Sequence, residues 1–196
     1  MQESMNEKIS METYLAREEQ AEYKSEYERG RVRAMRGGSV NHGIIGNNVN
    51  GELRTAIGDK NLDYVAINSE VRVFIEAADA YVYPDGMVIC GEVETAAQDE
   101  HSVVNPILVV EVLSKSTGSR DRGDKFHMYC SLPAFREYVL IDQYKPVVDV
   151  LYREEPTCWK MVTTIGLDKS VYLQTLDVSI PMADIYRKVS GLQAPL

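Results

Sequence analysis

The chain has 196 residues, of which 44% are hydrophobic and 26% are charged. This size and composition predict one globular domain with a substantial core, and they exclude an intrinsically disordered chain. No apolar run approaches the roughly 18 residues that indicate a membrane-spanning helix, so we expect no membrane association. The formal net charge of −9 argues against a protein that coats nucleic acid, because phosphate binding depends on Lys and Arg. Any contact with DNA therefore needs a local basic patch.

The N-terminal segment and the cysteines indicate a cytoplasmic protein. Residues 1–20 are polar and acidic, and they lack the basic start and apolar middle of a secretory signal. The cysteines Cys90, Cys130 and Cys158 are odd in number and far apart, with no CxxC pair. This pattern favours reduced thiols over a disulfide framework or a zinc site.

The first third of the chain predicts two helices separated by a strand. The first helix is expected at 11–27 with Ser10 as its N-cap, followed by a strand at 31–35. After the Gly37-Gly38-Ser39 turn, apolar residues near a 3.6-residue period predict an amphipathic helix at 42–57. This second helix needs a sheet to cover.

Short apolar runs then predict the sheet itself. The expected strands are 64–67, 71–75, 80–83, 87–90 and 107–113. The polar stretch 97–105, which contains His101, is expected to be a surface loop.

The remaining elements complete an α/β architecture. A helix at 121–130 lies between the strands 107–113 and 137–141, which predicts a crossover unit. The last expected elements are a hairpin of strands 147–152 and 159–164 and a helix at 182–189. We predict a single domain over 1–196 with a mixed central β-sheet flanked by helices. Its parts are an N-terminal helix at 11–27, a core at about 28–152, and a C-terminal hairpin and helix at about 153–190.

Glu111 is an acidic residue within the apolar run 107–113. Burying a carboxylate costs several kcal/mol unless a cation pairs with it or binds it, so a metal ion is a candidate partner. Asp85 follows Pro84 just before another apolar strand, and two acids on adjacent strands suit a shared metal. Two alternatives stay open: Asp85 is a turn residue, or Glu111 lies at an edge facing water or pairs with an arginine.

Two basic clusters are candidates for nucleic-acid binding. The first has strand spacing, which places its side chains on one face, and consists of Arg29, Arg31 and Arg33. The second follows Glu111 and consists of Lys115, Arg120, Arg122 and Lys125. The alternative is that both clusters are solvated charges that balance nearby acids.

Several short motifs follow one another in a characteristic order. They are Tyr83-Pro84-Asp85, Glu111-Val112-Leu113-Ser114, Asp121 with Lys125, and the segment 136–142. Further matches lie upstream at 26–30 and 39–42 and downstream at 184–186, so nearly the whole chain is covered. Their order and spacing resemble the Uma-two family of restriction endonucleases, a branch of the PD-(D/E)xK nuclease superfamily.

The resemblance implies a restriction-endonuclease-like core and a metal-dependent nuclease. Asp85, Glu111 and the Val112 carbonyl would hold Mg²⁺, with Mn²⁺ as an alternative, and Glu26 would add a third acid from the first helix. These hard oxygen ligands suit Mg²⁺, which keeps several waters when bound. The implied substrate is DNA. We expect a homodimer because cutting two strands suits two sites.

The superfamily's usual lysine lies two residues after the acid, where this chain has Leu113. Lys115 lies four residues after Glu111, roughly 13 Å along an extended strand, which is too far without a turn. Lys125, one helical turn beyond Asp121, is the better replacement for orienting water or stabilising charge on the phosphate. We expect its replacement by alanine to abolish cleavage and to leave folding largely intact.

Two further questions stay open at this level. His42 either supports a hydrogen-bond network or faces the cleft, and His127 either packs on the core or has a role in the site. The missing lysine at position 113 and the acidic charge also allow a different function. In that alternative, a catalytically inactive nuclease fold acts as a nucleic-acid-binding or assembly module.

Overall fold

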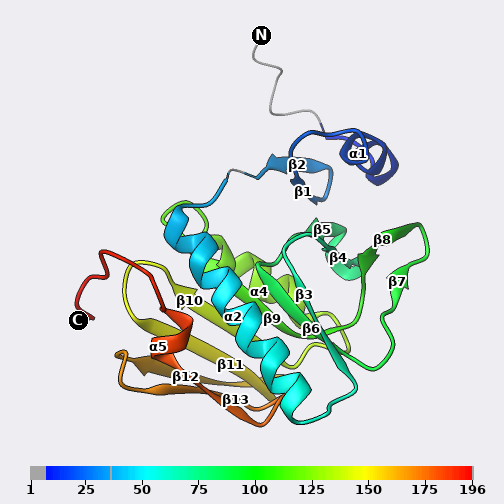
Figure 1. The fold of residues 1–196 in the computed structure, drawn as a ribbon. Coiled ribbons are helices and arrows are strands. Elements are labelled where there is room, and N and C mark those ends of the chain that lie inside the picture. Colours follow the sequence, from blue (N-terminus) through cyan, green and yellow to red (C-terminus); the bar gives the residue numbers. More distant parts are fainter. Residues whose placement is uncertain (1–7, 36, 196) are drawn as a thin grey trace.

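The computed structural model describes residues 8–35 and 37–195. Residues 1–7, part of the segment expected to lack a secretory signal, lie outside the described residues. The described chain contains two six-stranded sheets and one two-stranded sheet, with helices on the larger surfaces (Figure 1). The mixed α/β class predicted from the sequence is confirmed.

The main sheet has the strand order β12-β11-β10-β9-β6-β3. Strands β9 and β10 are parallel, as the predicted crossover requires, and the other neighbours are antiparallel. The predicted hairpin near the C-terminus is confirmed as β11 and β12. The strands are β3 (Tyr64–Asn68), β6 (Gly86–Cys90), β9 (Pro106–Leu113), β10 (Glu137–Asp142), β11 (Val147–Glu155) and β12 (Cys158–Ile165).

Helix α2 (Val40–Asp59) crosses one face of the main sheet, where Figure 1 shows it in cyan. Its apolar stripe, which includes Ile45 and Leu53, packs in one cluster with Val110 and Val112 of β9. Because neighbouring strand residues point to opposite faces, Glu111 points to the other side of the sheet. The fold therefore directs Glu111 toward the segment that follows β9.

The second sheet has the order β2-β1-β5-β4-β8-β7. The prediction that the strand candidates 71–75 and 80–83 join the central sheet is wrong, because β4 and β5 belong to this second sheet. Its strands are β1 (Ser25–Glu28), β2 (Arg31–Ala34), β4 (Arg72–Ile75), β5 (Ala80–Val82), β7 (Thr95–Ala96) and β8 (Asp99–Val103). A short 3-10 helix η1 (Glu76–Ala78) connects β4 to β5.

The expected surface loop at 97–105 is also wrong, since it contains β8. In this strand Asp99 and Ser102 are buried, and both accept hydrogen bonds of 2.9 Å from Nε of Arg72. A strand stabilised by a buried polar network lacks the apolar pattern that would reveal it in the sequence.

Helix α1 (Met11–Glu18) is shorter than the predicted 11–27. Ser10 caps it as expected, with its Oγ accepting from the amide of Thr13 at 3.2 Å. The rest of the predicted helix is divided between turns and irregular backbone at 19–24 and strand β1, whose Tyr27 packs among the buried rings of Tyr14 and Tyr81. Tertiary packing overrides local helix propensity here.

The helical segment after β9 is irregular. It consists of α3 (Gly118–Arg120), a π-helical turn η2 (Asp121–Lys125) and α4 (Phe126–Cys130). The Tyr138 hydroxyl donates to the carbonyl of Asp121 at 2.9 Å, which satisfies a backbone acceptor within this turn. The predicted helix at 121–130 is therefore present, but its first half is π-helical.

The C-terminal part closes the α2 face. Strands β13 (Ser170–Leu173) and β14 (Val178–Pro181) form a hairpin that was not predicted. Helix α5 (Met182–Ile185) is shorter than the predicted 182–189. Buried Glu137 of β10 accepts from the amides of Gln174 and Thr175, so it joins the hairpin turn to the main sheet.

Candidate active site

Asp85 lies immediately before β6, at the end of its pairing with β9. Its amide donates to the carbonyl of Val110 at 3.1 Å. Its Oδ2 accepts from the amide of Val112 at 2.7 Å, so the side chain extends the ladder beyond the first residue of β6. This arrangement fixes the Asp85 carboxylate beside the end of β9, with 18% of the side chain exposed.

Glu111 is buried on β9, directly before Val112, whose amide binds Asp85. Its Oε1 accepts from Lys125 Nζ at 2.8 Å and from the Tyr129 hydroxyl at 3.2 Å. Burial raises the pKa of Glu111 well above its ordinary value; nearby Lys125 opposes this shift, and the charges of Asp121 and Asp85 add to it. The site therefore disfavours an unpaired carboxylate at this position.

Lys125 is buried at the centre of the cluster. Besides Glu111, its ammonium contacts Glu26 Oε1 at 3.0 Å and the carbonyl of Tyr83 at 3.3 Å. Burial lowers the pKa of Lys125, but the charges of Glu111, Glu26 and Asp121 outweigh it, so the net shift is upward. Lys125 therefore stays protonated, and it approaches Glu111 from the helical side as the sequence predicts.

Lys115, the other lysine considered, lies elsewhere. It is exposed, and its ammonium lies 5.5 Å from the centre of the Tyr144 ring.

Glu26 also reaches the cluster, but from strand β1 and not from the first helix as predicted. Its Oε1 accepts from the amide of Tyr83 at 3.2 Å, and its Oε2 accepts from Arg120 Nη1 at 2.6 Å. Burial raises the pKa of Glu26, but Lys125 and Arg120 together outweigh burial and lower it. Glu26 is therefore an ionised partner for two cations.

His42 lies in the first turn of α2, and the structure places it beside Asp85. Its Nε2 is 3.3 Å from Oδ2 of Asp85. Burial lowers the pKa of His42, but the hydrogen bond and charge of Asp85, the carbonyl of Val112 and the charge of Asp121 raise it overall. The sequence leaves two roles open for His42, and the contact with Asp85 makes it a neighbour of the carboxylate cluster.

Asp121 and Tyr129 are members of the cluster that sequence reasoning did not assign to the site. Asp121 is 3% exposed, and its charge acts on Glu111, Lys125 and His42. Burial raises its own pKa, against the attraction of Lys125. The signal that would have found both residues is their four-residue spacing from Lys125, which places all three on one side of a helix.

The candidate site carries an excess of acids. Four carboxyl groups, those of Glu26, Asp85, Glu111 and Asp121, lie near two permanent cations, Lys125 and Arg120. Such an excess in a partly buried cluster attracts further positive charge.

Two of the carboxylates also have an oxygen that is not used by hydrogen bonds from the described residues. The hydrogen bonds from the described residues use Oε1 of Glu111 and Oδ2 of Asp85, which leaves one oxygen of each carboxylate without a donor from this part of the chain. Within residues 8–35 and 37–195, no three His, Cys, Asp or Glu side chains have metal-ligand spacing. Mg²⁺ needs only one or two carboxylates because it retains several waters, so Asp85 and Glu111 fit it.

The basic residues differ in their ion pairs and in their exposure. Arg120 pairs with Glu26 and Glu28 and is 12% exposed, whereas Arg122 pairs with Asp149. In contrast, Arg31 and Arg33 are exposed on β2.

The hairpin register relates the exposed arginines to the cluster. Arg33 lies opposite Glu26 and Arg31 lies opposite Glu28. Directly opposed residues point to the same face, so Arg31 and Arg33 share the face of Glu26. Arg29 lies in the intervening turn with a φ of 49°.

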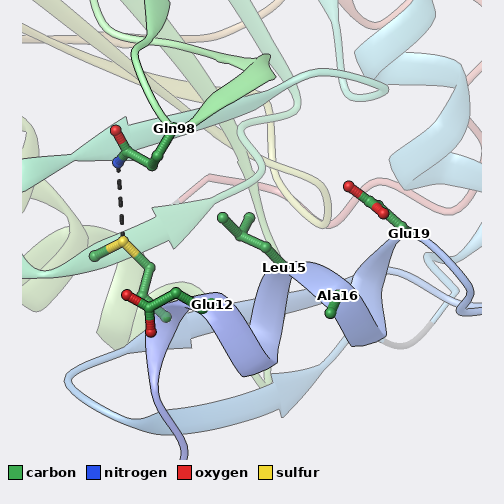
Figure 2. A pocket seen from close by; sticks show the side chains of 6 residues that line it. Glu12, Leu15, Ala16, Glu19 and Gln98 are labelled. Carbon is green, nitrogen blue, oxygen red and sulfur yellow. Dashed lines mark hydrogen bonds between the residues drawn. The ribbon is translucent and has the colours of Figure 1, made fainter.

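A separate shallow hollow runs along α1 (Figure 2). It is lined by Met11, Glu12, Leu15, Ala16, Glu19 and Gln98, with Gln98 Nε2 lying 3.8 Å from Met11 Sδ. These lining residues include no member of the carboxylate cluster. The concentration of charge, and not this hollow, therefore defines the candidate site.

Comparison with known proteins identifies the family of the chain. A family model named Uma2, with the description "Putative restriction endonuclease", matches residues 11–183. The chain belongs to the Uma-two family. The resemblance predicted from the order of motifs is thereby confirmed.

Two curated relatives of this Uma-two protein come from Synechocystis sp. strain PCC 6803. "Uncharacterized protein sll1609" is 36% identical over 153 residues, which cover 78% of this chain and 85% of the relative. "Uncharacterized protein slr1290" is 31% identical over 188 residues, covering 92% of each chain. Neither name states an activity.

A solved structure shares the fold. It is described as "a putative nuclease belonging to DUF820" from Anabaena variabilis ATCC 29413, and it matches with a TM-score of 0.72 at 17% identity. The match covers 91% of this chain and 97% of that one. The predicted nuclease-like α/β fold is confirmed. None of the helices in the described part of the chain is long and apolar enough to cross a membrane.

Proposed function

We propose that this Uma-two protein is a metal-dependent nuclease that hydrolyses phosphodiester bonds in DNA, with Mg²⁺ as its cation. The observation that carries the proposal is the convergence of Asp85, Glu111, Glu26 and Lys125 at one end of β9. An acid-rich, partly buried cluster beside a protonated lysine suits phosphoryl transfer, which depends on charge stabilisation and positioning.

Asp85, Glu111 and the Val112 carbonyl are the groups that would hold the ion. A bound Mg²⁺ would supply an activated water and would offset charge on the phosphate. The Val112 amide orients Asp85 through its 2.7 Å hydrogen bond. The Tyr129 hydroxyl and Lys125 orient Glu111 through bonds of 3.2 and 2.8 Å to its Oε1.

Lys125 is the group proposed to stabilise the phosphate. An ammonium has three N–H donors, and Lys125 directs them at Glu111, Glu26 and the Tyr83 carbonyl. Contact with a phosphate oxygen therefore requires one of these bonds to be exchanged. Glu26 is suited to the exchange because Arg120, at 2.6 Å, continues to neutralise it.

The nucleic-acid contacts are proposed to begin at the β1–β2 hairpin. Arg31 and Arg33 are exposed on the face that also carries Glu26, so they extend basic charge outward from the cluster. The other proposed contacts are Arg29, Lys115 and Arg122. Arg120, which the sequence also suggested, is instead paired with Glu26 and Glu28. A homodimer, which would provide two sites for two strands, is part of the same proposal.

One assay tests the proposal. Plasmid DNA is incubated with the full chain and Mg²⁺ or Mn²⁺, and nicked and linear products are quantified. Asp85→Asn and Glu111→Gln should each reduce cleavage about 100-fold or more, because several kcal/mol of charge stabilisation are lost. Asp124→Asn is the matched control, since Asp124 is an exposed acid of the same helical segment.

A second candidate is a nuclease fold that binds nucleic acid or a partner without turnover. The observation that favours it is that Lys125 already compensates both Glu111 and Glu26. No cleavage by the wild type with either ion, together with retained DNA binding, would support this candidate and reject the enzyme.

A further inference from the structure

We infer that His42 is a nitrogen ligand of the proposed cation, so that the site prefers a first-row transition-metal ion such as Mn²⁺ over Mg²⁺. This inference rests on the proposed function, because it concerns the same cation site. It adds a residue that the ligand set of Asp85, Glu111 and the Val112 carbonyl does not contain.

The first support is the distance between His42 and Asp85. Nε2 of His42 lies 3.3 Å from Oδ2 of Asp85. Two adjacent ligands of an octahedral ion with bonds of 2.0–2.1 Å lie about 3 Å apart. The two side chains therefore need only a small adjustment to bind one ion at adjacent positions.

The second support is that the His42 ring is held in place. The His42 amide donates to Oγ of Ser39 at 3.1 Å, which caps α2. Gly38 lies against the ring so closely that a Cβ at Gly38 would be 2.9 Å from Nδ1. The close approach to Gly38 limits the orientations of the ring and directs Nε2 toward Asp85.

The third support is that α2 is fastened to the backbone on which the other ligands lie. Nδ2 of Asn50 donates to the carbonyl of Asp85 at 3.0 Å. Ser39 bonds to Gln143, whose Nε2 donates to the carbonyl of Leu113 at 2.9 Å. The helix that carries His42 therefore has a fixed position relative to Asp85 and the end of β9.

The chemistry of the donor set then determines the ion. Mg²⁺ prefers oxygen ligands, whereas imidazole nitrogen strengthens binding of transition-metal ions. With His42 added, the proposed set is His42, Asp85, Glu111 and the Val112 carbonyl, which is one nitrogen donor beside three oxygen donors.

The test uses Mn²⁺ as the probe and the full chain without DNA. Electron paramagnetic resonance gives the Mn²⁺ affinity, and its pulsed form detects coupling to a ligand ¹⁴N nucleus. The chain has only three histidines, so the nitrogen can be assigned by His42→Asn. His101→Asn and His127→Asn are matched controls because both residues are exposed.

We expect wild-type protein and both controls to show ¹⁴N coupling, and His42→Asn to lose it. The Mn²⁺ affinity of His42→Asn should fall at least about tenfold, while its Mg²⁺ affinity, measured by competition, changes little. Gly38→Ala should weaken the coupling while keeping the ring, and circular dichroism verifies folding of each variant.

The outcomes separate this inference from the proposed function. Persistent coupling in His42→Asn, or Mn²⁺ binding without coupling in the wild type, overturns the role of His42. If Asp85→Asn loses Mn²⁺ binding while His42→Asn keeps the affinity of the wild type, the metal site stands and the nitrogen ligand is rejected. If the wild type binds no Mn²⁺, both ideas are rejected. If the wild type shows ¹⁴N coupling from His42 but cuts no DNA, His42 remains a metal ligand and the nuclease proposal is rejected.

Discussion

The Lys125 ammonium lies 2.8 Å from Oε1 of Glu111, and both groups are almost fully buried. A second carboxylate, Glu26, lies 3.0 Å from the same ammonium. Because Lys125 is the cation that both carboxylates share, removing it affects stability as well as activity. This coupling changes what is expected of variants in the site.

Replacing Lys125 by Met should lower the free energy of unfolding by about 3–5 kcal/mol, because two buried carboxylates lose their shared cation. This expectation differs from the one drawn from the sequence, in which loss of Lys125 leaves folding largely intact. Urea denaturation in the presence of a chelator measures the change. Adding Mg²⁺ should restore part of the loss, since a cation again offsets the acids.

Lys115→Met is the control for that experiment, because Lys115 is exposed. Its free energy of unfolding should stay within about 0.5 kcal/mol of the wild type. An equal loss in both variants would contradict the role given to the buried ammonium.

Replacing Glu111 by Gln should separate stability from activity. Burial and the charges of Asp121 and Asp85 disfavour an ionised Glu111, and Lys125 retains Glu26 as a partner. We expect the free energy of unfolding without metal to stay within about 1 kcal/mol of the wild type or to increase. Cleavage of plasmid DNA should be lost. A strongly destabilised variant would show that Glu111 is mainly a structural ion-pair partner.

The double variant Arg31→Gln with Arg33→Gln should weaken DNA binding. The logarithm of DNA affinity falls linearly with the logarithm of salt concentration, and each phosphate contact that is removed reduces the steepness of this slope by about one. Fluorescence anisotropy in Ca²⁺ across a series of salt concentrations should therefore give a slope smaller by about two. Arg54→Gln is the matched control, because Arg54 is exposed on α2. An unchanged slope in the double variant would exclude the hairpin from the DNA contacts.

Glu137→Gln tests a buried acid outside the site. Burial raises the pKa of Glu137 above 4.5, although hydrogen bonds from Thr175 and Gln174 oppose this shift. A carboxyl whose pKa is higher in the folded state binds its proton more tightly there, so its contribution to stability is greatest below pH 4.5 and declines as the pH rises through the folded pKa.

The measurement is urea denaturation of the wild type and of Glu137→Gln at a series of pH values. The stability of the wild type relative to Glu137→Gln should decrease as the pH rises above about 4.5. The opposite slope would mean that the hydrogen bonds outweigh burial.

The parts of the fold that the sequence predicted are those whose apolar pattern matches their environment. Helix α2 has one apolar stripe, and β9 is a nearly continuous apolar run because both of its faces are covered. In contrast, β8 and β1 are stabilised by Arg72 and by packing of Tyr27, which depend on distant partners. Sequence periodicity carries no information about such partners.

The candidate site was predictable to a similar degree. Asp85, Glu111 and Lys125 could be proposed from motifs, and they lie together in the structure. Asp121 and Tyr129 share four-residue spacing with Lys125, but the sequence does not show that the Tyr129 hydroxyl reaches Glu111. The sequence also could not predict that Arg120 pairs with Glu26. This pairing makes Arg120 a largely buried partner of an acid and not a free basic residue.

Leu113 occupies the strand position at which the superfamily pattern has a lysine, and it is 5% exposed within an apolar cluster that includes Met128 and Tyr129. A lysine introduced there would place a second ammonium in this apolar packing, close to the one that Glu111 already accepts. A functional lysine at position 113 therefore requires compensating changes in the residues packed around it. In this chain the apolar strand residue Leu113 and the helical Lys125 suit each other, because the ammonium reaches Glu111 from the helix while position 113 stays in the apolar packing.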